Sequence, residues 1–261
     1  MRNIFITTII IFFFTGCKND SGKTEPVSIK NIQPVTNTKN LTSSFMNWWT
    51  YHYNDISLES DFSALDDKFQ SISKEEFLRK LTTGRYIPVE MKTDNVKTYK
   101  LYKLSSKVDK EISSTIKNFS SEIYKLYKKE GNKFPDFELT DLEGTIYNNE
   151  SLVGKITIIK TWFIACKPCV QEIPELNKLV NKYKDNTNYL FLSLALDNEN
   201  DLKNFLEKTE FNYKVAAEQR NLIENQLNLN AYPRHLVINQ NGNIDKIFGK
   251  VSDLTDYLEK L

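Results

Sequence analysis

Two cysteines lie three positions apart in the second half of the chain, Cys166 and Cys169, with Pro168 between them. The alternating apolar residues 156–159 predict a buried strand just before the pair, and helical sequence follows it. Free N–H groups and the dipole at a helix start favour a thiolate at the first cysteine, and Lys167 adds a positive charge. The pattern predicts a redox-active dithiol in which Cys166 is the nucleophile and Cys169 resolves the mixed disulfide.

Two other uses of a Cys-x-x-Cys pair are less compatible with this sequence. A structural zinc site needs four ligands, and the chain has no second Cys-x-x-Cys and no pair of histidines at ligand spacing. A purely structural disulfide is the other alternative, but a two-residue loop before a helix holds little of the chain together. We therefore expect no metal and no cofactor.

The residues around the dithiol extend the motif. Trp162 stands four positions before the first cysteine, and Pro174 stands five positions after the second. We expect Pro174 to kink the helix after the dithiol, because a proline inside a helix removes a hydrogen bond. The segment resembles the active site of the thioredoxin superfamily. Glu172, three residues after Cys169, narrows the resemblance to the membrane-anchored thiol-disulfide oxidoreductases of the TlpA/ResA type, related to redoxin and AhpC/TSA proteins. The resemblance covers about residues 133–261 and implies an α/β, thioredoxin-like fold, in which a central mixed β-sheet is flanked by helices.

A second segment, residues 230–239, matches the proline loop of the same family. Cis peptide bonds are largely a proline phenomenon, and we expect one at Tyr232-Pro233. It would expose the Tyr232 backbone beside the dithiol for pairing with a substrate; a proline that merely turns the chain is the alternative. The predicted substrate-binding residues are Trp162, Pro168, Tyr232 and Pro233.

Three polar residues near the dithiol need separate interpretations. Glu172 is expected on the same helix face as Cys169, where its carboxylate can accept or return a proton and tune the cysteine pKa; a surface glutamate is the alternative. Lys160 occupies the strand position where thioredoxins carry a buried acid, and we expect its side chain to snorkel to the surface. The alternatives are a buried charge that favours thiolates and, if its pKa falls, a base. His235 is expected to be an ordinary, outward-facing strand residue; a role in the pH dependence of the site is the alternative.

The third cysteine, Cys17, follows Arg2 and the apolar stretch 4–14. This order is typical of a lipoprotein signal peptide over residues 1–16, with Cys17 lipidated after cleavage. The stretch is too short for an ordinary membrane-spanning helix. An uncleaved anchor with a free thiol is the alternative, and both place the protein on a membrane of the bacterial cell envelope, with its redox domain in the periplasm.

Between the signal peptide and the redox domain we expect two further parts. Residues 17–40 are polar and contain two prolines, which predicts a flexible tether. Residues 41–131 predict a mainly helical α+β module of unknown role, without residues at catalytic spacing. We expect the adjacent tryptophans 48 and 49 to fill its core; a binding surface is the alternative. Its expected elements are helices near 41–52, 74–83 and 109–129, and strands at 86–91 and 96–104. The thioredoxin-like domain then covers residues 132–261.

The formal net charge of +1 gives no electrostatic reason to expect nucleic acid as a partner. The resemblance implies an enzyme that reduces disulfides of exported proteins, with apocytochrome c as one substrate class and a membrane thiol-disulfide protein as electron donor. An oxidant or isomerase of the same fold is the first alternative. A peroxide-reducing redoxin is a second, but Phe163 stands where its Thr-x-x-Cys motif needs threonine. The third is a binding protein that only senses redox state.

Overall fold

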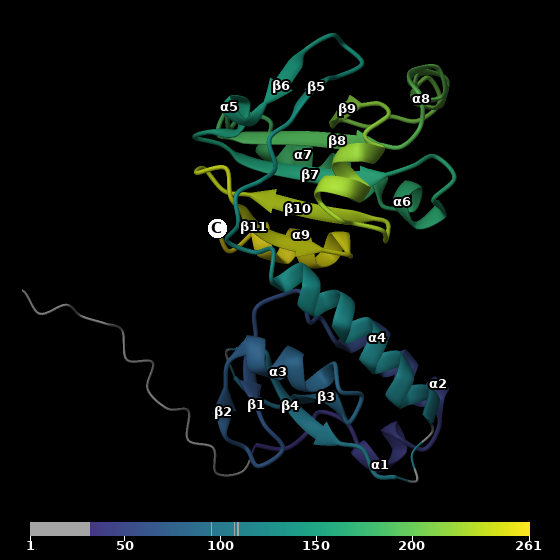
Figure 1. Cartoon of the computed structure of the whole chain (residues 1–261), viewed down its shortest axis with the longest axis vertical. Coiled ribbons are helices and arrows are strands. Elements are labelled where there is room, and N and C mark those ends of the chain that lie inside the picture. The colour runs from purple at the N-terminus through teal and green to yellow at the C-terminus, as the bar shows by residue number, and fades with distance from the viewer. Residues whose placement is uncertain (1–31, 95, 107, 109) are drawn as a thin grey trace, which may run out of the picture. The chain divides into compact units, whose positions relative to one another are not determined.

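The structure is a computed structural model that describes residues 32–94, 96–106, 108 and 110–261 (Figure 1). The predicted signal peptide, Cys17 and the first part of the predicted tether lie outside the described residues. Among the described residues, no helix has the length and apolar character needed to cross a membrane.

A five-stranded mixed sheet forms the centre of the C-terminal half, in the order β11-β10-β7-β8-β9. Strand β7 is central, pairing in parallel with β8 and antiparallel with β10. The strands are β7 (Ile156–Trp162), β8 (Tyr189–Ala195), β9 (Lys214–Ala216), β10 (Arg234–Ile238) and β11 (Ile244–Phe248). The parallel pairs β7/β8 and β8/β9 require crossovers, and helices α7 and α8 lie within these connections. The predicted thioredoxin-like fold is confirmed.

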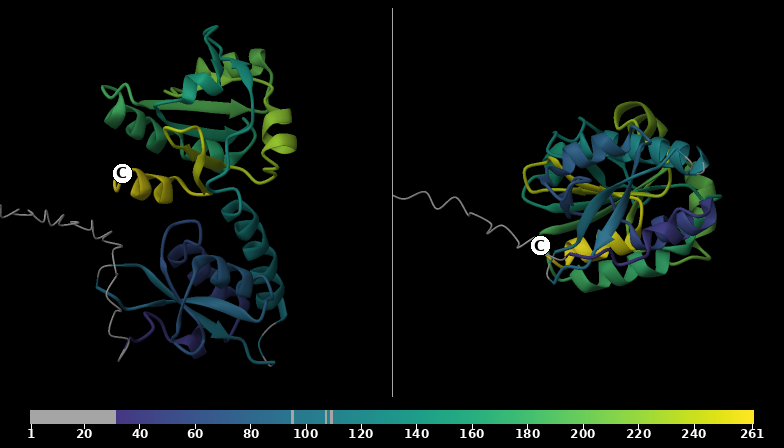
Figure 2. Two further views of the ribbon diagram at one scale, coloured as in Figure 1. Left: turned by 60° about the vertical axis from the view of Figure 1, so that its left-hand side comes forward. Right: turned by 90° about the horizontal axis from the view of Figure 1, so that it is seen from below.

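Helices and a hairpin cover opposite faces of this sheet. Ile158 and Trp162 pack with helices α7 (Ile173–Tyr183), α8 (Glu199–Leu206) and α9 (Val251–Leu258), and α7 and α9 lie on one side of the sheet (Figure 2). Ile159 points to the other face, because successive side chains of a strand alternate. Elements on that face are the hairpin β5 (Glu138–Thr140) and β6 (Ile146–Asn148), helix α5 (Asn149–Leu152) and the π-helical turn η1 (Asn221–Gln226).

The helix after the dithiol is broken into two pieces. Helix α6 (Lys167–Gln171) ends at Glu172, which is also the N-cap residue of α7. Pro174 lies in the first turn of α7, where its missing N–H costs nothing, whereas in a continuous helix it would remove a hydrogen bond. The predicted interruption at this proline is confirmed, and it sets Glu172 at a corner between two helices.

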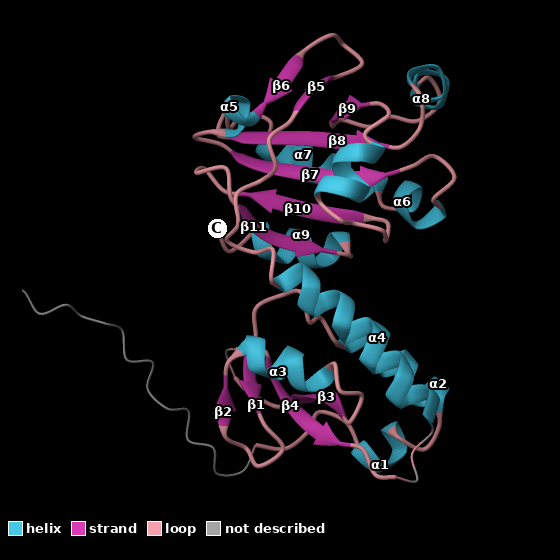
Figure 3. Cartoon of the chain, viewed as in Figure 1, coloured by secondary structure: helices cyan, strands magenta, loops and turns pink. Residues whose placement is uncertain are grey.

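The N-terminal part combines a four-stranded sheet with helices, as the colouring by secondary structure shows (Figure 3). The strand order is β2-β1-β4-β3, and β1 runs parallel to β4. The short strands β1 and β2 were not predicted from the sequence, and the helix expected over 41–52 is two helices, since Ser44 caps the second. The elements are α1 (Thr38–Leu41), α2 (Phe45–Asp55), β1 (Ser63–Leu65), β2 (Ser71–Ile72), α3 (Lys74–Leu81), β3 (Tyr86–Met91), β4 (Thr98–Lys103) and α4 (Lys110–Tyr127).

The predicted tether extends too far, because its last residues are ordered. The Val35 N–H donates to the Glu90 carbonyl, and the Lys92 N–H donates to the Gln33 carbonyl, each at 2.9 Å. Helix α1 then begins within the range assigned to the tether. Backbone pairing with the edge of β3 therefore fixes a segment whose composition alone predicts flexibility.

Residues 32–261 form one compact unit. The boundary predicted at residue 131, between the N-terminal module and the thioredoxin-like domain, therefore stays a prediction. One buried acid links residues far apart in the chain: Glu59 accepts hydrogen bonds from the Arg234 guanidinium at 2.9 Å and from the Gly249 N–H at 2.6 Å. Burial raises the pKa of Glu59, while the charge of Arg234 opposes this. The guanidinium of Arg234 is thus already matched by a carboxylate.

Candidate active site

The dithiol is a disulfide at the junction of β7 and α6. Cys166 is the N-cap residue of α6, Pro168 lies in its first turn, and the two cysteines are joined by an S–S bond. Cys166 is 6% exposed and Cys169 is fully buried, so Cys166 is the more accessible of the two residues. The backbone that leads into Cys166 is fixed by a hydrogen bond, which the Ile164 N–H donates to Asp197 Oδ2 at 2.8 Å.

Trp162 lies in the same apolar cluster as both cysteines and is fully buried. Its indole N–H donates to Ser193 Oγ at 2.6 Å, and its ring contacts Phe205 and Phe211. The side chain therefore packs in the core that contains the redox turn and does not face a substrate. Ser193 was not singled out from the sequence, although a lone serine within the apolar run of β8 was a signal of a buried polar contact.

The Tyr232-Pro233 peptide bond is cis, as predicted. The Tyr232 ring packs edge-on against Phe163 of the redox turn, with ring centroids 5.4 Å apart, and its hydroxyl donates to Glu224 at 3.2 Å. This ring contact brings the proline loop beside the segment that leads into Cys166. Burial first, and the neighbouring Glu224 second, raise the pKa of Tyr232 to about 12, so its hydroxyl is neutral.

The expected exposure of Lys160 and His235 is wrong, because both side chains are fully buried. In the antiparallel pairing of β7 with β10, Lys160 and His235 are directly opposite partners. Partners in this position point to the same face of the sheet, and here the alternation turns them to the face that holds Trp162 and the dithiol. Lys160 lies in the central strand and has no open route to solvent, so it cannot snorkel.

Glu172 reaches this pair from the corner between α6 and α7. Its side chain is 9% exposed and forms an ion pair with the Lys160 ammonium, and its Oε1 lies 3.2 Å from His235 Nε2. The imidazole contact is close but not aligned as a hydrogen bond. We call Lys160, Glu172 and His235 the buried triad. The alternative of a surface glutamate is wrong for Glu172.

The protonation states of the buried triad follow from burial and charge. Burial alone raises the pKa of Glu172, but contacts with His235 and Lys160 outweigh it and leave the pKa below its usual value. Burial lowers the pKa of His235 below its ordinary value, and the Glu172 contact only partly offsets this. Burial also lowers the pKa of Lys160, against the pull of the carboxylate. At neutral pH, Glu172 is ionised and His235 is neutral.

Tyr213 is a fourth group beside this triad, and no sequence pattern pointed to it. It is 4% exposed, and its hydroxyl has no hydrogen-bond partner. Burial raises the pKa of Tyr213 well above its ordinary value, and the negative charge of Glu172 adds to the effect. Tyr213 is therefore a neutral neighbour of the carboxylate.

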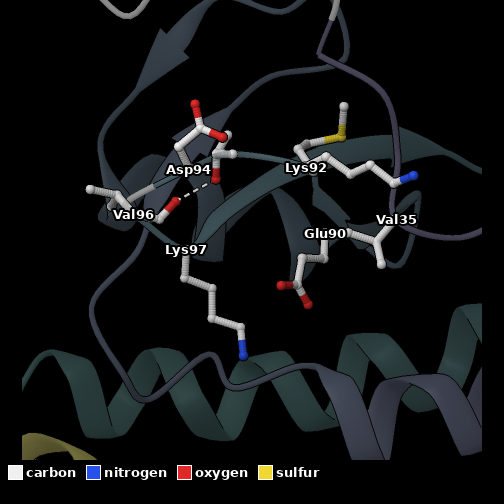
Figure 4. A pocket seen from close by; sticks show the side chains of 8 residues that line it. Val35, Glu90, Lys92, Asp94, Val96 and Lys97 are labelled. Carbon is white, nitrogen blue, oxygen red and sulfur yellow. Dashed lines mark hydrogen bonds between the residues drawn. The ribbon is translucent and has the colours of Figure 1, made fainter.

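Two further features concern sites other than the dithiol: possible metal ligands and a surface hollow. Among the described residues, no group of three or more His, Cys, Asp or Glu side chains is placed to hold a metal ion. A surface hollow of about 370 Å³ lies at the turn between β3 and β4, and contains none of the predicted site residues. Acidic and basic side chains alternate around it, with Glu90, Lys92, Asp94 and Lys97 labelled in Figure 4. The hollow therefore has no clear preference for an anion or a cation.

A disulfide at a helix start, a buried tryptophan beneath it and a cis-proline loop beside it, on a mixed sheet, define a thioredoxin-like redox protein. Comparison with known proteins agrees. Residues 131–247 match the AhpC/TSA family. The chain is 31% identical over 134 residues to the thiol-disulfide oxidoreductase ResA of Bacillus cereus, which covers 50% of this chain and 78% of that protein.

Two further relatives give similar figures. The thioredoxin-like protein YneN of Bacillus subtilis is 26% identical over 133 residues, covering 48% of this chain and 78% of that protein. The solution structure of a thiol:disulfide interchange protein from Bacteroides sp. has a TM-score of 0.46 and 23% identity, covering 51% of this chain and 89% of that one. From the similarity to the Bacillus cereus protein, the chain belongs to the ResA-like family of thiol-disulfide oxidoreductases and is an enzyme of that class.

Proposed function

We propose that this enzyme works in the reducing direction, on disulfides of exported proteins in the bacterial cell envelope. The observation that supports thiol-disulfide exchange is the arrangement of the two cysteines, with Cys166 at the start of α6 and 6% exposed, and Cys169 fully buried. The reducing direction is the one that the resemblance to ResA-like proteins implies. A nucleophile must reach its substrate, whereas a resolving thiol only has to reach the nucleophile.

The exchange has two steps. The Cys166 thiolate attacks one sulfur of the substrate disulfide, forms a mixed disulfide and releases the other substrate sulfur as a thiolate. Cys169, after losing its proton, attacks the Cys166 sulfur, forms the Cys166–Cys169 bond and releases the second substrate thiolate. Two electrons pass from the dithiol to the substrate, and a thiol-disulfide protein of the membrane returns the enzyme to the dithiol form by the reverse chemistry.

Glu172 is the proposed proton acceptor for Cys169 in the second step. It is ionised in the disulfide form, and only the carboxylate form can take up a proton. Its place one helical turn beyond Cys169, at the break between α6 and α7, supports this role. Trp162 and Pro168 shape the turn, while the backbone of Tyr232 at the cis-proline loop pairs with the substrate chain.

The proposed attachment to the membrane is through a lipidated Cys17, supported by the positive residue and apolar stretch that precede it in the sequence. The anchor would hold the enzyme at the surface where both its exported substrates and its electron donor are found. Mass spectrometry of the protein purified from membranes tests this, because lipidation adds acyl chains to a new N-terminus at Cys17. Retention of an unmodified Cys17 would contradict it.

The direction of exchange is tested by the reduction potential of the Cys166–Cys169 pair, measured by equilibration in glutathione or dithiothreitol buffers. A potential near roughly −270 mV, the value of thioredoxin, supports the reductase, because the pair can then reduce strained or exposed disulfides, whose potentials are higher. A potential near roughly −120 mV would instead make it a disulfide-forming oxidant. The variant Cys166→Ser/Cys169→Ser serves as the control. A phenotype kept by that variant would favour a binding protein over an enzyme.

A further inference from the structure

The buried triad places a cation, the Lys160 ammonium, on the sheet face that holds the dithiol. Lys160 is flanked in the sheet by His235 of β10 and by Ser193 of β8, its register partners on either side. All three side chains are fully buried, and Glu172 closes over them from the corner between α6 and α7. The fully buried Lys160 ammonium therefore has as its ionic partner the carboxylate of Glu172, whose side chain is 9% exposed.

A carboxylate behind the dithiol would by itself work against the chemistry. Like charges at short range disfavour each other, so an ionised Glu172 opposes a thiolate at either cysteine. The effect is strong where water is excluded, because the effective dielectric constant is low. A positive charge in contact with the carboxylate removes this opposition without removing the proton acceptor.

We propose that Lys160 is a positioning residue of thiol-disulfide exchange: its buried ammonium holds the Glu172 carboxylate in place and cancels its charge, so that the dithiol can ionise beside it. The inference rests on the proposed function and concerns the same site. It gives a role to a residue that was expected at the surface from the sequence, with a buried charge only as an alternative.

The balance of charge during the resolving step shows what the lysine contributes. Before the step, the ammonium, the carboxylate and the Cys169 thiol sum to zero. The thiol proton then moves to a Glu172 oxygen, and the ammonium faces a neutral acid and a thiolate, so the sum is again zero. The thiolate attacks the Cys166 sulfur of the mixed disulfide, and the electron pair leaves with the substrate thiolate. Without Lys160 the same step carries an uncompensated negative charge throughout.

The other groups that face Glu172 do not supply this positive charge. His235 on β10 is neutral at pH 7, and Tyr213 ahead of β9 is a neutral phenol. Arg234, next to His235, has its guanidinium paired with Glu59. Among the described residues around the carboxylate, Lys160 is thus the cation in direct contact with it.

The test is a double-mutant cycle on the full chain with Lys160→Met, Glu172→Gln and the two combined. Two quantities are measured: the pH dependence of Cys166 alkylation by iodoacetamide in the reduced protein, and the equilibrium constant of the dithiol with glutathione. We expect Lys160→Met to lower the thiolate fraction at pH 7 about tenfold and Glu172→Gln to raise it by a similar factor. The combined variant should return to within about threefold of the wild type, since both charges are gone.

Two further variants separate charge from packing. Lys160→Arg keeps the charge and should preserve most of the wild-type alkylation profile. Lys182→Met removes a cation of the same domain, from an exposed ion pair with Glu259, and should leave both quantities unchanged. If Lys160→Met does not fold, the comparison of Glu172→Gln with the combined variant still measures the effect of the lysine, without leaving a carboxylate unpaired.

The possible outcomes distinguish a failure of the role proposed for Lys160 from a failure of the proposed function. Equal alkylation profiles in the wild type and Lys160→Met, or equal profiles in Glu172→Gln and the combined variant, would overturn the role of Lys160 while leaving the oxidoreductase in place. Shifts of the same sign in the two single variants would also overturn it, because a purely structural role disturbs the site in one direction. A wild-type protein without a reversible dithiol couple would instead overturn the proposed function, and this inference with it.

Discussion

Two buried histidines, one in each half of the molecule, have contrasting surroundings. His52 of α2 is 3% exposed and packs between aromatic rings, with centroids 5.1 Å from Trp48 and 4.9 Å from Phe119. His235 of β10 is fully buried and lies 3.2 Å from the Glu172 carboxylate. Neither ring has an aligned hydrogen bond, so what separates them is the carboxylate in contact with the second.

The two buried tryptophans repeat this contrast. The indole N–H of Trp48 has no hydrogen-bond partner, whereas that of Trp162 donates to Ser193 at 2.6 Å. His52 and Trp48 in the N-terminal part thus pack without a hydrogen bond from their ring nitrogens. In the redox part, the Trp162 indole donates to Ser193, and the Glu172 carboxylate forms an ion pair with Lys160. Burial of a polar residue therefore does not by itself indicate chemistry: what its polar atoms contact decides whether it serves packing or the site.

The largest expected effect lies in the redox half. Replacing Cys166 with serine should lower the rate of protein disulfide reduction at least about a thousandfold, because a hydroxyl is not ionised at pH 7 and cannot exchange with a disulfide. The turnover of a model protein disulfide under a reducing donor measures this. His52→Phe is the matched change in the other half and should keep the rate within about twofold. A comparable loss in His52→Phe would break the comparison, since it would place chemistry in the N-terminal part.

The second prediction concerns the pH dependence of stability. Burial first, and the Lys250 charge second, lower the pKa of His52 to about 4, below the 6.5 of an unfolded histidine. The unfolded chain therefore takes up the proton first, and stability falls as the pH drops from 6.5 towards 4. The gap corresponds to about 3 kcal/mol.

Urea unfolding at a series of pH values measures this loss, with His52→Phe as the comparison. The variant should lose less stability on acidification by about that amount, and the remaining loss includes His235, whose lowered pKa acts with the same sign. Parallel curves for the wild type and His52→Phe would show that His52 is not buried in its neutral form.

The third prediction uses the tryptophans. Trp162→Phe removes a buried hydrogen bond and leaves the Ser193 hydroxyl without that partner, whereas Trp48→Phe removes an indole N–H that had none. Both changes lose the same volume, so their difference isolates the polar term. We expect Trp162→Phe to be more destabilising by about 1–2 kcal/mol in the free energy of unfolding. Equal losses in denaturant titrations would erase the contrast between the two cores.

The smallest effect is expected at the rim of the redox site. Tyr232→Phe removes a hydroxyl that contacts Glu224 but keeps the ring against Phe163 and the backbone before the cis-proline. The proposed substrate contact is made by that backbone, so kcat/KM for a protein disulfide should change less than about twofold. A tenfold loss would mean that the hydroxyl itself takes part in recognition.

Sequence patterns predicted the parts of the site that depend on near neighbours. The Cys-x-x-Cys pair, the strand before it and the break at Pro174 are set by residues within a few positions of one another, and all were predicted correctly. The cis bond at Pro233 belongs with them, since it was inferred from a short motif. In the N-terminal part, the helices expected over 74–83 and 109–129 are likewise present as α3, with Ser73 as its N-cap, and α4.

What the sequence by itself determined about this protein is therefore its reactive pair, its fold class and its family. Only the tertiary structure decided that Lys160 and His235 are buried, that they meet Glu172, and that Tyr213 stands beside them. The physical reason is that the register of β7 against β10 brings together residues 75 positions apart, and no local periodicity reports such a register. The same holds for the parallel pairing of β1 with β4 and for the ordered end of the predicted tether, which both depend on backbone hydrogen bonds between distant residues.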